Sequence, residues 1–403
     1  MSSKSKAVLI GLDSITGLQT ARILAGRGVD VIAIAGDHRN FCCRTRVCER
    51  IIEADIEGEG LIEVLAGLGR TLEERAVLVP CTDPSVLLIS RHRQELERSY
   101  HVVLPEPQTV EMLVHKVSFF TYAERAGLAI PPTAVLANGD DAERAAETLR
   151  FPVILKPSLK AHPTWRSHFD VKAAKLSTPG ELLSAYDRVG GETEAEALIA
   201  QQWVESGDAS LFSCNCYFDR DSKPLVTFVA RKLRQWPPRV GTSSLGEECH
   251  NDVVLEETIR LFEGVRFRGL GYLEMKRDGH TGEHFIIEPN VGRPTGRSAI
   301  AEAGGVELLY TKYCDAVGLP LPAETEQRYT GAKWVDLVRD FRSAAYYWRR
   351  GELTLGEWRR SWSGSKAHAV LSWSDPAPFL GDLWQSAGKA AGRNHAAGEA
   401  ATG

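Results

Sequence analysis

The chain has 403 residues, enough for about two to four compact units, each with its own hydrophobic core. Its net charge of −5 excludes the basic surface expected of a protein that binds nucleic acid or an anionic membrane. No apolar run approaches the roughly 18 residues of a membrane span, and the N-terminus lacks the apolar core of a signal peptide. We therefore expect a cytoplasmic protein with an ordinary globular composition.

The eight cysteines are expected to be reduced thiols, as in most cytoplasmic proteins. Three of them, Cys42, Cys43 and Cys48, cluster within seven residues. They have no partner Cys or His pair at the spacing of a zinc finger, so structural or incidental thiols are favoured over a metal site.

The first 110 residues alternate strand-like and helix-like segments. Apolar runs at 7–10, 29–34 and 76–80 predict buried strands, and the spacing over 16–28 predicts a helix. Strands separated by helices predict a doubly wound, Rossmann-like domain with a parallel sheet. The Gly-x-Gly-x-x-Gly fingerprint is absent although Asp37 follows the second strand, so NAD binding is disfavoured.

The turn at 80–84 lies at the carboxyl end of a strand, where open α/β sheets bind ligands. Thr82 and Asp83 are therefore candidates for a substrate site. The same residue types are common helix N-caps, and we favour that interpretation.

A second unit begins near residue 110. A helix is predicted from Lys116 to Gly127, and the apolar strand that follows ends in Lys156. A lysine in that place either extends to solvent or meets an anion, and the sequence leaves both open. Strands are expected at 151–157, 195–204, 211–218 and 225–230, the last running directly into Arg231 and Arg234.

Two strand-like runs, 271–278 and 286–293, flank a turn-rich segment and predict a hairpin. Alternation places Glu288 and Asn290 on one face, and pairing brings Glu274 to the same face. Three hard oxygen ligands at one point are typical of a Mg²⁺ site that completes its shell with water and nucleotide phosphates. A hairpin with a solvated acidic face explains the pattern equally well.

The last eighty residues differ in character. Six of the nine tryptophans lie there, beside basic pairs such as Arg349 and Arg350, namely Trp334, Trp348, Trp358, Trp362, Trp373 and Trp384. Stacking on nucleic acid bases would explain such a mixture, but the acidic balance favours a small helical unit packed on the main body. An Ala/Gly-rich tail from about 387 is expected to be disordered.

Taken in order, these signals resemble the ATP-grasp superfamily over roughly residues 110–318. The resemblance is closest to the carboxylate–amine ligase branch, which includes D-aspartate ligases and carbamoyl-phosphate-synthase-like proteins. It implies an α/β fold with a pre-ATP-grasp domain, a two-subdomain ATP-grasp fold and a small mostly helical extension. The implied bounds are 1–110 for the first domain, 111–200 for the lid, 201–320 for the core and 321–403 for the extension.

The resemblance also implies a role for each matching residue. ATP would be bound by Lys116, Lys156, Lys172, Gln201, Gln202, Trp203, Val204, Glu205 and Asp208. Mg²⁺ would be held by Glu274, Glu288 and Asn290. The transferred phosphoryl group and the acyl phosphate would be stabilised by Arg231, Arg234, Arg293 and Arg297.

Two departures from the family pattern affect these roles. The lid loop at 158–168 contains no glycine, so side chains would replace backbone amides as phosphate ligands, namely Lys160, His162, Arg166 and His168 with Lys172 beyond. The family's Asn-Pro-Arg is Asn290-Val-Gly-Arg293 here, so the arginine is displaced by one residue and Arg297 competes for its role.

The implied activity is ATP-dependent amide or peptide bond formation between a small carboxylate and an amine, releasing ADP and phosphate. Residues 120–195 would close as a lid to exclude water. A homodimer is compatible with the resemblance, and no nucleic acid or membrane partner is expected. Carbamoyl-phosphate-synthase-like or carboxylation chemistry and a non-catalytic ATP-binding sensor are the alternatives.

Overall fold

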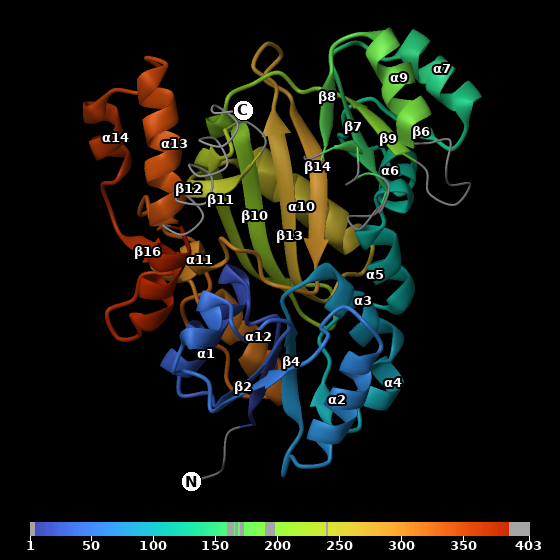
Figure 1. The fold of residues 1–403 in the computed structure, drawn as a ribbon. Helices are drawn as coiled ribbons and strands as arrows, with labels where there is room; N and C mark the ends of the chain where they lie inside the picture. Colours follow the sequence, from blue (N-terminus) through green and yellow to red (C-terminus); the bar gives the residue numbers. More distant parts are fainter. Residues whose placement is uncertain are drawn as a thin grey trace, which may run out of the picture.

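The computed structural model describes residues 5–158, 165, 168–169, 173–189, 198–238 and 241–386, which form three β-sheets and their covering helices (Figure 1). The sheets follow one another along the chain, and the mixed α/β architecture agrees with the expected fold class. The predictions made for Lys160, His162, Arg166, Lys172 and the tail from 387 concern residues outside the described ranges.

The first sheet has five parallel strands in the order β3-β2-β1-β4-β5. Its central strand, β1 (Ala7–Ile10), sends alternate side chains into two separate cores, one on each face, which confirms the doubly wound prediction. The other elements are β2 (Val31–Ala35), β3 (Arg50–Glu53), β4 (Ala76–Pro80), β5 (Tyr100–His101), α1 (Ile15–Gly26), η1 (Phe41–Arg44), α2 (Gly60–Gly69), α3 (Asp83–Arg91) and α4 (Arg93–Leu96).

The second sheet is antiparallel, with four strands in the order β6-β9-β7-β8. Val153 and Leu155 of β7 (Val153–Pro157) pack under helices α7 (Gly139–Thr148) and α9 (Pro179–Val189). Because strand residues alternate, Lys156 points away from those helices. The remaining strands are β6 (Thr133–Leu136), β8 (Ala174–Leu176) and β9 (Leu198–Gln202).

The third sheet has seven strands in the order β14-β13-β10-β11-β12-β15-β16, with β14 at one edge (Figure 1). Helix α10 (Asp252–Gly264) buries Val254, Leu261 and Phe262 against one face, a spacing that places all three on one side of the helix. The strands are β10 (Leu211–Phe218), β11 (Pro224–Trp236), β12 (Thr242–Glu248), β13 (Gly269–Arg277), β14 (His284–Val291), β15 (Lys333–Val335) and β16 (Lys366–His368).

Helices at the borders of this sheet join it to the rest of the molecule. α5 (Pro107–Val114) lies beside the edge strand β14, and α6 (Lys116–Arg125) continues towards the second sheet (Figure 1). On the face opposite α10, α11 (Ala299–Ala303) and α12 (Leu308–Val317) lie between the seven-stranded sheet and the first domain. The first domain is thereby held against the core sheet.

The C-terminal segment corrects the sequence analysis in one respect. Helices α13 (Leu337–Arg349) and α14 (Leu355–Ser361) were expected, but β15 and β16 extend the core sheet and are not part of a separate helical unit. Each has only three residues, too few for a periodic pattern, so pairing with β12 decides the conformation of β15, and pairing with β15 decides that of β16. Trp334 of β15 is buried, whereas Trp373 is 90% exposed.

No helix in the described ranges combines the length and the apolar content that crossing a bilayer requires. Cys42, Cys43 and Cys48 are free, and no group of three or more metal-ligating His, Cys, Asp or Glu side chains occurs among the described residues.

Candidate active site

The predicted hairpin forms, and its register brings the expected oxygen ligands together. In the β13–β14 pairing Glu274 lies opposite Glu288 and Tyr272 lies opposite Asn290. Directly opposed residues share a face of a sheet, so these four side chains project to the same side. The register shifts only after Glu274, where Ile287 is the extra residue.

Glu274 is the most densely contacted of these residues. Its carboxylate lies 3.1 Å from the Lys232 ammonium and 3.6 Å from the Arg297 guanidinium, and it accepts a 3.2 Å hydrogen bond from the Tyr272 hydroxyl. Burial raises the pKa of Glu274, but the charges of Lys232 and Arg297 outweigh it and leave that pKa below its ordinary value. The carboxylate is therefore ionised at neutral pH.

Asn290 connects the core sheet to the first domain through Arg293. The Arg293 guanidinium donates to the Asn290 side-chain oxygen at 2.5 Å and forms an ion pair with Asp83 at the start of α3. Thr82 caps that helix by accepting from the Ser85 amide, as favoured from the sequence. Asp83 additionally lines the candidate site, which the N-cap interpretation alone would have missed.

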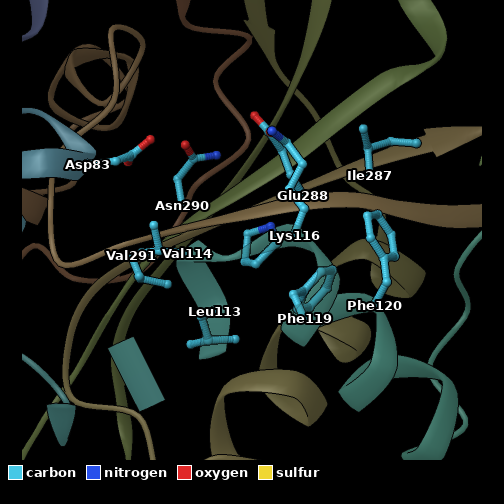
Figure 2. Close-up of a pocket in the computed structure, with 11 residues that line it drawn as sticks. Asp83, Leu113, Val114, Lys116, Phe119, Phe120, Ile287, Glu288, Asn290 and Val291 are labelled. Atoms are coloured by element: carbon cyan, nitrogen blue, oxygen red, sulfur yellow. The ribbon is translucent and has the colours of Figure 1, made fainter. Parts of the chain in front are cut away.

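A pocket opens at the edge strand β14, between it and helices α5 and α6 (Figure 2). It is lined by Asp83, Lys116, Glu288 and Asn290 together with apolar residues, including Phe119. Figure 2 shows acidic, amide and basic side chains of three separate segments at one cavity. The pocket therefore combines oxygen ligands for a cation with a cation for a phosphate.

Lys156 approaches the same region from the second sheet. It is 9% exposed, donates to Gln201 Oε1 at 3.1 Å and lies 4.7 Å from the centre of the Phe120 ring. Burial lowers the pKa of Lys156 to about 8, while the charge of Glu288 opposes that shift. Lys116 begins α6 and donates to the Pro157 carbonyl at 3.3 Å, so the two predicted phosphate lysines lie side by side.

The segment predicted to line the base connects the second sheet to the third. Gln202 and Trp203 donate their amides to Pro132 and Pro152, and Val204 is buried. Gln201 is engaged by Lys156 and also donates to Thr133.

The two predicted ribose acceptors differ in their surroundings. Asp208 begins the short helix η3 (Asp208–Ser210) and accepts from Gln235 at 2.7 Å and from Tyr347 at 2.6 Å. Glu205 is more exposed and lies 3.8 Å from Lys175. Glu205 is therefore the better acceptor for a ligand, because both oxygens of Asp208 already accept hydrogen bonds.

Two of the four predicted catalytic arginines are not brought to the carboxylate face. Arg231 lies opposite Phe212, on the face that packs under α10, and pairs with Glu247 at 2.9 Å. Arg234 is buried against Asp340 of α13. The strand continues through both because β11 extends to Trp236, six residues beyond the predicted end at 230.

Lys232 was missed by the sequence analysis, although it lies between the two predicted arginines. The alternation of β11 sends it to the face of Glu274, and the strand irregularity after it sends Arg234 elsewhere. Tyr272 was also not predicted, although it lies two residues before Glu274 and strand alternation therefore places both on the same face.

The chain resembles curated ligases over part of its length. No family model matches the chain. D-aspartate ligase of Enterococcus faecium (strain Aus0004) is 25% identical over 234 residues, covering 56% of this chain and 55% of that protein. D-alanine–D-alanine ligase of Stutzerimonas stutzeri (strain A1501) is 24% identical over 182 residues, covering 41% and 50%. The chain spans about half the length of the curated relatives it matches.

Solved structures share the fold over more of the chain. N5-carboxyaminoimidazole synthetase from Staphylococcus aureus, in complex with ADP, superposes with a TM-score of 0.61 at 15% identity, covering 80% of each chain. The biotin carboxylase domain of Hydrogenobacter thermophilus 2-oxoglutarate carboxylase, in complex with MgADP, gives 0.62 at 15% identity and covers 81% of this chain and 73% of its own.

These relatives and structural neighbours all belong to the ATP-grasp superfamily, in agreement with the resemblance in the sequence. The mixed α/β fold of this chain is similar to that of the two solved structures over about four fifths of its length.

Proposed function

We propose that this ATP-grasp chain is an ATP-dependent carboxylate–amine ligase that forms an amide bond through an acyl phosphate. The observation that carries the proposal is the pocket lined by Lys116, Glu288 and Asn290, with Glu274 paired opposite Glu288 and Lys156 close enough for its charge to interact with Glu288. Carboxylates and ammonium groups in this arrangement suit a metal-complexed polyphosphate. The ligases among its curated relatives support the same class of chemistry.

The residues present fit a magnesium ion. Glu288 has no hydrogen bond or ion pair within the described part of the chain, and Glu274 and Asn290 add two further oxygen donors on the same face. A hard cation with a preference for oxygen suits this donor set, and none of the described residues that line the pocket is a cysteine or histidine that would favour zinc. Bound Mg²⁺ would supply charge screening for the phosphate oxygens of the nucleotide.

The basic residues around Glu274 suit the binding of an anionic substrate. Lys232 and Arg297 balance the Glu274 carboxylate in the described structure. With Mg²⁺ held by Glu274, Lys232 and Arg297 would be available to an anionic substrate and to its phosphorylated form. Arg293, held between Asp83 and Asn290, would position the same anion from the side of the first domain.

The reaction follows from these positions. A carboxylate oxygen of the substrate attacks the γ-phosphorus of ATP, and the bond to the bridging oxygen breaks with its electron pair leaving on ADP. The amine lone pair then attacks the acyl carbon, phosphate leaves with the bonding pair, and the amine loses a proton. The chain contributes orientation and charge stabilisation, since no group at the site is placed as a dedicated base.

The nucleotide base would lie against 201–204, with Glu205 accepting from the ribose hydroxyls. An acyl phosphate hydrolyses in water, so the second sheet and its helices, within residues 120–195, would close over the cleft. Lys116 and Lys156 would then grip the phosphates, as compact ammonium charges can.

The test is ADP and phosphate release from purified protein with Mg·ATP and pairs of acids and amines, followed by mass spectrometry. D-aspartate and D-alanine belong in the panel because the curated relatives are named for them. Release that requires both partners, with a product lighter than their sum by one water, is the expected result.

A second candidate, ATP-dependent carboxylation, is favoured by one specific observation. The carboxylase and synthetase structures cover about four fifths of this chain. Bicarbonate is therefore tested separately in the same assay of ADP and phosphate release. Release that depends on bicarbonate and on no other acid would replace the ligase proposal with carboxylation.

A further inference from the structure

The C-terminal segment presents bulky apolar side chains to solvent. Twelve large apolar side chains are exposed among the described residues, and eight of them lie after residue 340, namely Phe341, Tyr346, Trp348, Leu355, Trp373, Leu380, Leu383 and Trp384. Single exposed apolar residues are ordinary on a protein surface. A concentration of them in one segment marks a surface that contacts another apolar body.

Helix α13 keeps its exposed apolar side chains apart from its packed face. The packed face contacts β11 and β12 and buries Asp340, Ser343 and Ala344. Phe341 and Trp348 are seven residues apart, so two turns of the helix bring them to one side. They are 54% and 64% exposed. The apolar side of α13 therefore remains open after the helix has packed on the sheet.

Helix α14 is fixed to α13, so the exposed side chains stand on a rigid frame. The indole nitrogens of Trp358 and Trp362 donate to the buried Asp340 carboxylate. The Phe341 ring lies 5.3 and 5.9 Å from the rings of the same two tryptophans. Leu355, the first residue of α14, is 63% exposed.

The same two helices are basic on their exposed side. Four exposed arginines form no side-chain hydrogen bond or ion pair with any described residue, namely Arg342, Arg349, Arg359 and Arg360. The exposed acids nearby are engaged, since Glu352 accepts from Arg350 at 2.7 Å and Glu357 accepts from Thr354 at 2.7 Å. The net charge of −5 is a sum over the whole chain and does not reveal this local excess of positive charge.

The last described helix, residues 377–386, adjoins the start of α13. Its Asp382 is close enough to Arg339 and Arg342 for their charges to oppose the rise that burial produces in the pKa of Asp382. Spacings of three and four residues place a second exposed apolar set on one side of this helix, namely Leu380, Leu383 and Trp384. We refer to α13, α14 and residues 377–386 together as the C-terminal surface.

The chemistry of the C-terminal surface suits an anionic bilayer. Tryptophan rings prefer the level of the lipid headgroups, leucine and phenylalanine enter the acyl boundary, and arginine is attracted to anionic headgroups. Nucleic acid would stack on the rings but would leave the leucines without a partner. A second copy of the chain, bound through the same face, would bring the unpaired arginines against one another.

We propose that the C-terminal surface binds the anionic headgroup layer of a lipid bilayer, with the indole rings and leucines inserted and the arginines on the headgroups. The expectation of no membrane partner rested on the net charge, which does not distinguish one face from another. Figure 1 shows α13 and α14 on the side of the molecule away from α5 and α6, so a bilayer bound there leaves the pocket beside β14 open. The inference does not depend on the proposed ligase activity.

The test is flotation of the purified full chain with two kinds of vesicle, one of phosphatidylcholine alone and one of equal parts phosphatidylcholine and phosphatidylserine. Each arginine near an anionic headgroup contributes about fivefold to affinity, so the mixed vesicles should bind at least about tenfold more tightly. High salt should release the protein from them, because exposed charges are screened. Insertion of the indole rings should shift the tryptophan fluorescence to shorter wavelength.

The charge variant is Arg342→Gln/Arg349→Gln, which should weaken binding to the mixed vesicles about 10- to 30-fold. The matched control, Arg70→Gln/Arg98→Gln, removes the same charge from exposed positions of the first domain and should bind like wild type. All four side chains are exposed, so the thermal unfolding midpoint should be retained in both variants.

The apolar variant is Trp348→Ser/Leu355→Ser, which should weaken binding about tenfold or more and reduce the fluorescence shift. Its control is Val253→Ser/Leu321→Ser, which replaces two apolar side chains that are 46% and 42% exposed outside the C-terminal surface. This control should keep the wild-type affinity.

Failure of the wild-type protein to float with the mixed vesicles would overturn the inference. Equal weakening by the two charge variants would reduce the binding to attraction by net charge and overturn it as well. Binding that survives the apolar variant unchanged would exclude insertion, with the same consequence. Retention of polyuridylic acid by the chain, without retention of vesicles, would assign the C-terminal surface to nucleic acid instead.

Discussion

Replacing Arg234 tests whether this arginine serves the reaction or the fold. Arg234 donates to both oxygens of Asp340 at 2.8 and 3.0 Å, and the Asp340 side chain is fully buried. Asp340 also accepts from the indole nitrogens of Trp358 and Trp362 at 3.1 and 2.8 Å. Arg234→Met leaves this carboxylate buried without its counter-charge.

The size of the expected loss of stability in Arg234→Met follows from that burial. Breaking a buried ion pair by removing one partner costs about 3–5 kcal/mol, a large part of the roughly 5–15 kcal/mol that stabilises a typical protein. The loss is measured by urea denaturation, where it should lower the midpoint by about 1 M or more. The double variant Arg234→Met/Asp340→Asn removes both charges and keeps an acceptor for Trp358 and Trp362, so it should recover about half of the loss or more.

Measurements of nucleotide binding distinguish a role of Arg234 in the reaction from a role in the fold. In the double variant the affinity for Mg·ATP and the rate of phosphate release should remain within about twofold of wild type, because Arg234 faces α13 and not Glu274. A single variant with an unchanged urea midpoint and abolished phosphate release would refute this reasoning. It would also restore the anion-binding role that the sequence predicted for Arg234.

Three further predictions concern the cleft. Glu288→Gln should abolish Mg²⁺-dependent ADP release while the thermal unfolding midpoint is retained, and wild-type turnover would contradict the metal assignment. Lys156→Met should weaken ATP binding about tenfold or more. In the wild type the pKa of Lys156 is about 8, so the affinity for ATP should fall as the pH rises through 8 and the lysine that binds the phosphates loses its charge. Lys156→Met should lack this dependence when binding is measured by calorimetry across pH 6.5–9.5, a range roughly centred on that value. Lys232→Met should lower kcat more than it raises the KM for ATP, whereas an effect on the KM for ATP alone would assign Lys232 to the nucleotide.

Local patterns in the sequence were sufficient for the elements that carry the site. The strands at 76–80 and 211–218 occur with the predicted bounds, and the hairpin that pairs Glu274 with Glu288 forms as alternation required. These features depend on neighbours within about twenty residues, so periodicity and turn chemistry report them directly.

Contacts between distant segments were decided only by the tertiary structure. Arg234 and Asp340 are 106 residues apart, and nothing local indicates that a helix near the end of the chain neutralises an arginine of the core sheet. The irregularity in strand pairing after Lys232, which turns Arg234 away from the face that Lys232 shares with Glu274, is not revealed by a single strand. The same holds for β15, which is too short to be a strand without its partner β12.

The sequence by itself therefore determined the order of elements and the oxygen ligands, because each rests on the two-residue period of a strand or on the residues of one turn. The tertiary structure decided which cations face Glu274 and which carboxylates of other segments pair with the remaining arginines. A side chain on β11 or β13 acquires a partner only when other sheets and helices pack against it, and that packing depends on the whole chain.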